Sequence, residues 1–166
     1  LKNKSLHRYH AIIAMQKIKK GKYSIGKTIL QNSFKDNNNS IFLKQLIVNL
    51  NLKQKNKFLH YFNDKEFEDN LAEVLYLFSG FYFDRNETQV SQLLLALSNY
   101  LNPNFASNYL LAFEQEIKNS KKRINFKVFN RIQNVGSEYK WYVNYQLVLN
   151  DLIEIGELEK ALNKKT

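Results

Sequence analysis

The sequence predicts an all-α fold, an α-solenoid of about ten helices arranged as antiparallel hairpins. The 166 residues include one Pro and five Gly, and so few chain breakers favour long helices over a turn-rich β-fold. Hydrophobic residues make up 44% of the chain, which is enough for a sizeable core and argues against disorder. A recurring spacing of large and small residues adds a third reason. We therefore expect a single solenoid domain over residues 1–166.

The N-terminal part, residues 1–62, predicts two basic helical hairpins. The recurring spacing of large and small residues is degenerate in them. Gly21 separates the first two helices, and the polar run 36–40 predicts a loop that caps the next helix. Apolar residues at helical spacing place these four helices at 6–19, 23–34, 41–50 and 53–62.

The C-terminal part, residues 69–166, predicts better-preserved hairpins. Pro103 disfavours a helical conformation of the residue before it and so marks the end of the best-defined hairpin. Gly156 interrupts the last helix, and a helical pattern resumes at Leu158. The expected helices lie at 69–83, 87–101, 105–117, 121–134 and 137–155.

A spaced set of large and small residues defines the repeat within the hairpin 69–101. Its large-small neighbours, Phe78-Ser79, recur as Ile13-Ala14 and Leu111-Ala112, and a small residue follows on the partner helix in the first and third hairpins. Small residues that face each other let two helices pack closely. The full set comprises Leu75, Phe78, Ser79, Tyr82, Ser91, Leu95 and Pro103.

This spacing resembles that of tetratricopeptide-repeat proteins, whose unit of about 34 residues is a helical hairpin. Residues 70–161 are similar to tetratricopeptide-repeat proteins of alphaproteobacteria, and segments 71–76, 101–105 and 139–142 carry the likeness. The resemblance implies a bacterial protein whose hairpins form a right-handed superhelix. Such a protein acts as a binding scaffold and is not an enzyme. A different α-solenoid and an ordinary helical bundle are the alternatives.

The resemblance also implies where a partner binds. The first helix of each hairpin lines the concave face of such a superhelix, and its positions not used for packing combine aromatic anchors with polar groups, which suits a peptide or protein segment. Alternatively, the tyrosines of this set pack between neighbouring repeats. The expected concave-face residues are Glu73, Tyr76, Phe83, Tyr109, Phe113, Glu116, Gln146 and Asn150.

Residue patterns for catalysis or cofactor binding are missing from the sequence. The chain has no Cys, which excludes disulfides and thiolate metal sites. His7 and His10 lie one helical turn apart without the acidic partner of a zinc-protease helix, and no glycine-rich phosphate loop occurs. We therefore expect no metal, no cofactor and no small-molecule substrate.

The positive charge is concentrated in the N-terminal third. Residues 1–60 carry thirteen Lys and Arg against the single acid Asp36, whereas residues 61–166 carry twelve against fourteen acids. This asymmetry suggests, as an alternative function, binding of RNA or of an anionic membrane, although AT-rich codon usage would also produce it. The densest cluster comprises Lys17, Lys19, Lys20, Lys22 and Lys27.

The compartment is left open between bacterial cytoplasm and periplasm. No apolar run approaches the roughly 18 residues of a membrane span. The chain begins at Leu1 and ends within a helical pattern, so we expect it to be a fragment of a longer protein.

Overall fold

The computed structural model describes residues 4–52, 63, 65–119 and 126–154, and over these ranges the chain forms helices and no strands, which confirms the all-α class. The expected helix 53–62 and the segment after Gly156 lie outside the described residues. The helices are α1 (Lys4–Lys19), α2 (Tyr23–Asp36), α3 (Ile41–Asn51), α5 (Phe67–Asp84), α6 (Thr88–Leu101), α7 (Ala106–Asn119), α8 (Phe126–Val135) and α9 (Ser137–Glu154).

Two hairpins, α1–α2 and α5–α6, turn in the same way. Gly21 and Asn86 adopt positive φ angles of 76° and 63° directly after the first helix of each hairpin. In both turns the next amide bonds back to the helix, from Lys22 N to Lys17 O and from Glu87 N to Tyr82 O, at 2.9 Å in each case. This is the Schellman end of a helix, which favours Gly or Asn at the positive-φ position.

The predicted close approach of small residues is present in both hairpins. A Cβ atom on Gly26 would lie 2.5 Å from Ile18 Cγ1 and 2.7 Å from Ala14 O, so α2 touches α1 too closely for a larger residue. In α5–α6 the two serine hydroxyls cross: Ser79 Oγ donates to Ser91 O at 2.8 Å, and Ser91 Oγ donates to Ser79 O at 2.7 Å.

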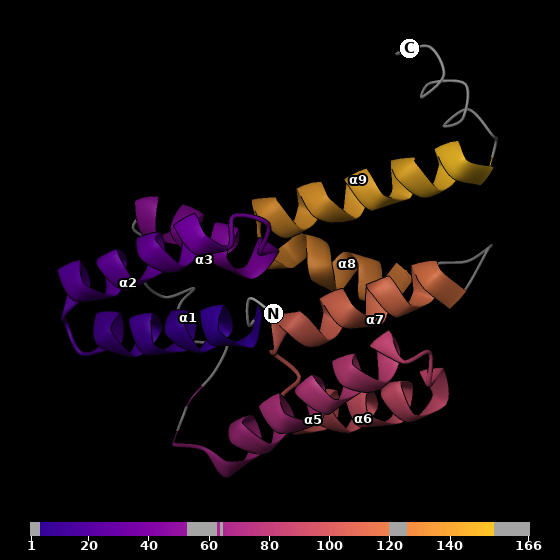
Figure 1. Ribbon diagram of the computed structural model, residues 1–166, viewed down its shortest axis with the longest axis horizontal. Coiled ribbons are helices and arrows are strands. Elements are labelled where there is room, and N and C mark those ends of the chain that lie inside the picture. The colour runs from indigo at the N-terminus through magenta and orange to yellow at the C-terminus, as the bar shows by residue number, and fades with distance from the viewer. Residues whose placement is uncertain (1–3, 53–62, 64, 120–125, 155–166) are drawn as a thin grey trace.

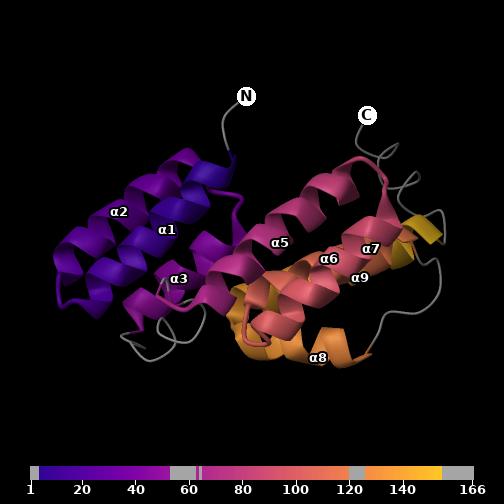
Figure 2. The same ribbon diagram turned by 90° about the horizontal axis from the view of Figure 1, so that it is seen from below.

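The helices form blocks, and helices that are far apart in the sequence pack against each other. Figure 1 shows α1–α3 at one end, α5–α6 along the lower edge and α7–α9 above them; Figure 2 shows the same blocks from below. α3 packs against α9. Gln45 of α3 accepts a hydrogen bond from Glu138 N at 2.9 Å and so caps the start of α9. The last helix therefore packs directly against the N-terminal block.

A buried ion pair ties α1 to the central helices. Arg8 donates to both carboxylate oxygens of Glu73 on α5, at 2.5 and 2.7 Å, and to Ser107 Oγ on α7 at 2.7 Å. Its guanidinium also lies within 5.1 Å of the ring centres of Phe42, Tyr76 and Phe105. Hydrogen bonds and aromatic faces on several helices thus hold one charge inside the molecule.

Candidate functional site

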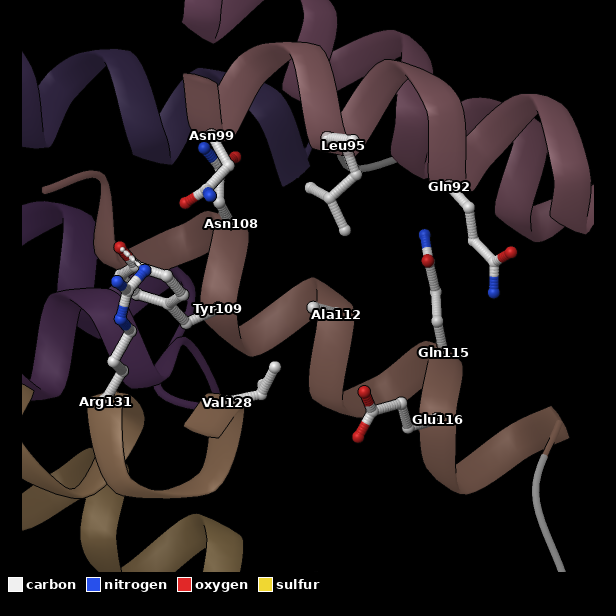
Figure 3. Close-up of a pocket in the computed structure, with 11 residues that line it drawn as sticks. Gln92, Leu95, Asn99, Asn108, Tyr109, Ala112, Gln115, Glu116, Val128 and Arg131 are labelled. Carbon is white, nitrogen blue, oxygen red and sulfur yellow. Dashed lines mark hydrogen bonds between the residues drawn. The ribbon is translucent and has the colours of Figure 1, made fainter. Parts of the chain in front are cut away.

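A groove of about 350 Å³ runs between α6, α7 and α8 (Figure 3). We call it the α6–α8 groove. Four apolar side chains line it: Leu95, Ala96, Ala112 and Val128. Seven polar side chains also line it, and four of these are carboxamides: Gln92, Asn99, Asn108, Gln115, Tyr109, Glu116 and Arg131.

Two carboxamides at one end of this groove have polar atoms without partners. Asn99 lies on α6 and Asn108 on α7, and Figure 3 shows them close together. Among the described residues, Asn99 Oδ1 and Asn108 Nδ2 are buried and have no hydrogen-bond partner. The other end of the Asn108 carboxamide is held, because its Oδ1 lies 3.0 Å from the Ser98 hydroxyl. One acceptor and one donor without partners thus lie buried at the same end of the groove.

Three further polar groups of the groove are held in place by neighbours. Gln115 Nε2 donates to Ser91 Oγ at 2.6 Å. Arg131 donates to the Tyr109 hydroxyl at 3.0 Å, and the Tyr109 hydroxyl in turn donates to Pro103 O. The Arg131 guanidinium lies 5.2 Å from the centre of the Tyr109 ring. A ligand would therefore meet a largely preformed surface.

A second groove, of about 250 Å³, lies where α5, α7 and α9 meet, and we call it the α5–α9 groove. Lys118 Nζ lies 4.6 Å from the centre of the Phe83 ring there. The Tyr142 hydroxyl donates to Glu114 Oε1 at 2.8 Å. Its lining residues are Phe83, Glu114, Ile117, Lys118, Tyr142 and Gln146.

Burial perturbs the titrating pair in the α5–α9 groove. Burial raises the pKa of Glu114; the hydrogen bond from Tyr142 opposes this rise, and the negative charge of Asp84 adds to it. Burial also raises the pKa of Tyr142, and the charge of Glu114 raises it further. The hydrogen bond between the two side chains fixes their positions between α7 and α9.

The structure distributes the expected concave-face residues over several environments. Phe83 and Gln146, from α5 and α9, line the α5–α9 groove, and Tyr109 and Glu116 line the α6–α8 groove. Asn150 is half-buried on α9.

Of the other three expected residues, two are buried and one, Tyr76, is half-buried between helices. Phe113 is fully buried in a cluster with Ile132 and Val143, where it offers no surface to a partner. Glu73 is buried against Arg8. Tyr76 packs edge-on against Phe105, with ring centres 5.4 Å apart, and burial raises its pKa. Tyr76 thus packs between helices, as the alternative interpretation expected.

The five lysines of the basic cluster gather where α1 ends and α2 begins, at one end of the molecule (Figure 1). Lys17 is half-buried, and Lys19, Lys20, Lys22 and Lys27 are exposed. Lys17 and Lys19 lie in the last turn of α1, where positive charge is favoured by the helix dipole.

The sequence had not singled out Asn99, Asn108 or Arg131. Asn within a helix usually marks a position that faces solvent. The spacing of residues in the sequence does not distinguish such a position from one that faces a groove. Gln115 is likewise polar in the sequence yet buried in the structure.

Within the described ranges, no three His, Asp or Glu side chains gather closely enough to hold a metal ion. None of the helices in the described part of the chain is long and apolar enough to cross a bilayer.

No family model, no curated protein and no solved structure matches this chain. The resemblance to tetratricopeptide-repeat proteins therefore stays a prediction from residue spacing.

Proposed function

We propose that this chain is a helical-repeat scaffold that binds an extended segment of another protein, and that the α6–α8 groove holds the main chain of that segment. The observation that supports this most strongly is the pair of buried carboxamide atoms without partners, Asn99 Oδ1 and Asn108 Nδ2. A buried polar group without a partner costs about 1–3 kcal/mol, and a ligand that satisfies it recovers that free energy.

A peptide main chain fits this pair because each residue carries one N–H donor and one C=O acceptor. The ligand N–H would donate to Asn99 Oδ1, and Asn108 Nδ2 would donate to the ligand C=O. Such contacts do not depend on the ligand's side chains. Charged and aromatic groups along the groove, Glu116, Arg131 and Tyr109, would add preference for particular side chains.

A peptide selection tests this proposal. Short random peptides are selected on the full chain, and their affinities are then compared between Asn99→Leu, which removes the acceptor, and Asn99→Asp, which keeps it. We expect at least a tenfold loss with Asn99→Leu, about 1.4 kcal/mol, and a much smaller loss with Asn99→Asp. Asn130→Leu, at an exposed position on α8, is the matched control.

A small probe isolates main-chain recognition from side-chain contacts. N-methylacetamide should shift the side-chain NMR signals of Asn99 and Asn108, whereas methyl acetate, which lacks the N–H, should shift them less. Equal affinity of peptides for Asn99→Leu and the original chain would contradict the proposal. Loss of binding with Phe83→Ala alone would instead move the site to the α5–α9 groove.

RNA binding is the second candidate, because five lysines gather on α1, α2 and the turn between them and could contact phosphate groups. This basic cluster is separate from the α6–α8 groove, which is lined by α6, α7 and α8. A fluorescence-anisotropy titration with single-stranded RNA checks it. Binding that weakens steeply with salt supports this candidate, and no binding at low salt removes it.

A further inference from the structure

The α5–α6 hairpin exposes a row of large apolar side chains on each of its two helices. Their exposed fractions range from 39% to 84%. On α5 the row comprises Phe67, Val74, Phe78 and Phe81. On α6 it comprises Val90, Leu93, Leu97 and Tyr100. Spacings of three, four and seven residues keep each row on one side of its helix. We call the two rows together the α5–α6 apolar face.

The α5–α6 apolar face lies away from the rest of the molecule. α7 packs on the opposite side of the hairpin, where Gln115 donates to Ser91 Oγ. Figure 1 shows α5 and α6 along the lower edge of the molecule with α7–α9 above them, and Figure 2 views this edge from below. The eight side chains therefore stay exposed within the described part of the chain.

The first hairpin provides an internal comparison. α1–α2 and α5–α6 correspond at a constant offset, with Gly21 matching Asn86 and Gly26 matching Ser91. The positions on α2 that correspond to Leu93, Leu97 and Tyr100 are occupied by exposed polar residues, Thr28, Asn32 and Lys35. The same hairpin geometry is therefore compatible with polar side chains at these positions. Val90 matches Ile25, which is exposed and apolar as well, so the contrast is confined to Leu93, Leu97 and Tyr100. A covering partner would explain the apolar side chains at these three positions.

The size and charge of the α5–α6 apolar face indicate what kind of partner covers it. With about 200 Å² per large side chain, its eight residues expose on the order of 800 Å², more than the roughly 300–600 Å² of the largest patch on a typical monomer. About 800 Å² is the area that each partner contributes to a standard interface. α6 carries no charged residue. On α5, Glu73 is buried against Arg8, and the other charges lie toward the ends of the hairpin, as at Arg85, whose guanidinium lies 3.9 Å from the centre of the Phe81 ring. The middle of the face therefore carries no charge that would repel an identical face.

We propose that the α5–α6 apolar face pairs with the same face of a second copy of this chain, so that two hairpins form a four-helix interface. An interface with two-fold symmetry needs one self-complementary patch, and this face, which is two helices wide and has no charge along its middle, meets that need. Two antiparallel helical hairpins that bury their apolar sides against each other are the usual arrangement of a four-helix bundle.

Sedimentation of the full chain tests the pairing. The original chain should sediment as a dimer, and Leu93→Thr with Leu97→Asn and Tyr100→Lys should shift it to monomer, with at least a tenfold weaker dimer. These replacements copy the residues of α2, so the hairpin should keep its helical circular dichroism. Val148→Thr, an exposed apolar position on α9, is the control and should leave the dimer unchanged.

Single cysteines locate the contact, because the chain has none of its own. Leu97→Cys, near the middle of α6, should form a disulfide between two copies under mild oxidation, and Val148→Cys should not. A monomer at every concentration would overturn the proposal, with residues 53–62 or another protein left to cover the face. A dimer that survives the triple substitution, or that crosslinks only through Val148→Cys, would overturn it as well.

Discussion

Among single residues, several polar side chains inside the molecule form hydrogen bonds with partners on other helices. Ser79 and Ser91 exchange hydrogen bonds across one hairpin, and Gln115 joins them from α7. Glu114 and Tyr142 pair in the same way between α7 and α9. Asn99 and Asn108 each keep a buried atom without a hydrogen-bond partner among the described residues, as His7 and Asn49 also do. The proposed function rests on Asn99 and Asn108 because these two line the α6–α8 groove.

The pair of Glu114 and Tyr142 predicts a pH dependence of stability. Burial raises the pKa of Glu114 above its usual value of 4.5, so the folded state binds its proton more tightly than the unfolded state does. The favourable contribution is therefore fully present below pH 4.5 and is lost as the pH rises through the raised pKa. Glu114→Gln mimics the protonated form and still accepts from Tyr142.

We expect Glu114→Gln to raise the melting temperature at pH 7 and to leave it nearly unchanged at pH 4. Thermal unfolding followed by circular dichroism at both pH values measures this. Glu116→Gln, one of the lining residues of the other groove, is the comparison. A Glu114→Gln variant that is less stable than the original chain at pH 7 would show that the carboxylate is needed as an ion.

Among the helices, the two hairpins α1–α2 and α5–α6 are built alike from different residues. Both end their first helix with a positive-φ residue, Gly21 or Asn86, and both pack small residues where the helices meet. One hairpin achieves the close contact with a glycine and the other with paired serines. The same device thus recurs in two hairpins, at small residues that the spacing analysis had marked; the repeat family itself stays a prediction.

The glycines of the hairpins should respond in opposite ways to alanine. Gly26→Ala places a methyl group against Ile18 and the Ala14 carbonyl, and overpacking of this kind costs about 1–3 kcal/mol. Gly80→Ala, within α5, meets no atom within 4 Å and should gain up to about 1 kcal/mol, because Ala favours a helix more than Gly. Urea unfolding measures both changes. Equal effects of the two substitutions would contradict the close contact at Gly26.

Across the whole molecule, contacts between distant segments join the blocks. Arg8 connects α1 to α5 and α7, and Gln45 connects α3 to the start of α9. Two hydrophobic clusters divide the interior, one among α1–α3 and one centred on α7–α9, and Ile41 of α3 belongs to the second. The N-terminal block is therefore held by polar links as well as by apolar packing.

Loss of the ion pair between Arg8 and Glu73 should weaken the whole fold. Their side chains are only 12% and 6% exposed, and removing one partner of a buried pair costs about 3–5 kcal/mol because the other charge stays buried without compensation. We expect Glu73→Gln to lower the free energy of unfolding by an amount near the lower end of this range. Glu68→Gln, exposed on the same helix, is the control for urea unfolding. Matching losses in both variants would argue against the link.

The helices could be predicted from the sequence because periodicity and breakers act locally. α2 begins at Tyr23 and α6 ends at Leu101, as their apolar spacing, Gly21 and Pro103 predict. Ser40 caps α3 by accepting a hydrogen bond from Leu43 N, as the polar run predicts. The candidate site was harder to predict from the sequence, because Phe113 and Asn108 are buried by helices that lie close only after folding.

The sequence by itself determined the all-α class, most helix ends and the small residues at which paired helices touch. These depend on backbone conformation and on neighbours within one or two turns. Only the tertiary structure decided that α3 packs against α9, that Glu73 pairs with Arg8, and that Asn99 and Asn108 line one groove. It also decided that the α5–α6 apolar face is left exposed by the part of the chain that the structure describes. Those outcomes depend on which helices pack together after folding. The sequence pattern around a polar or apolar residue is the same whether that residue faces water, a groove or another helix.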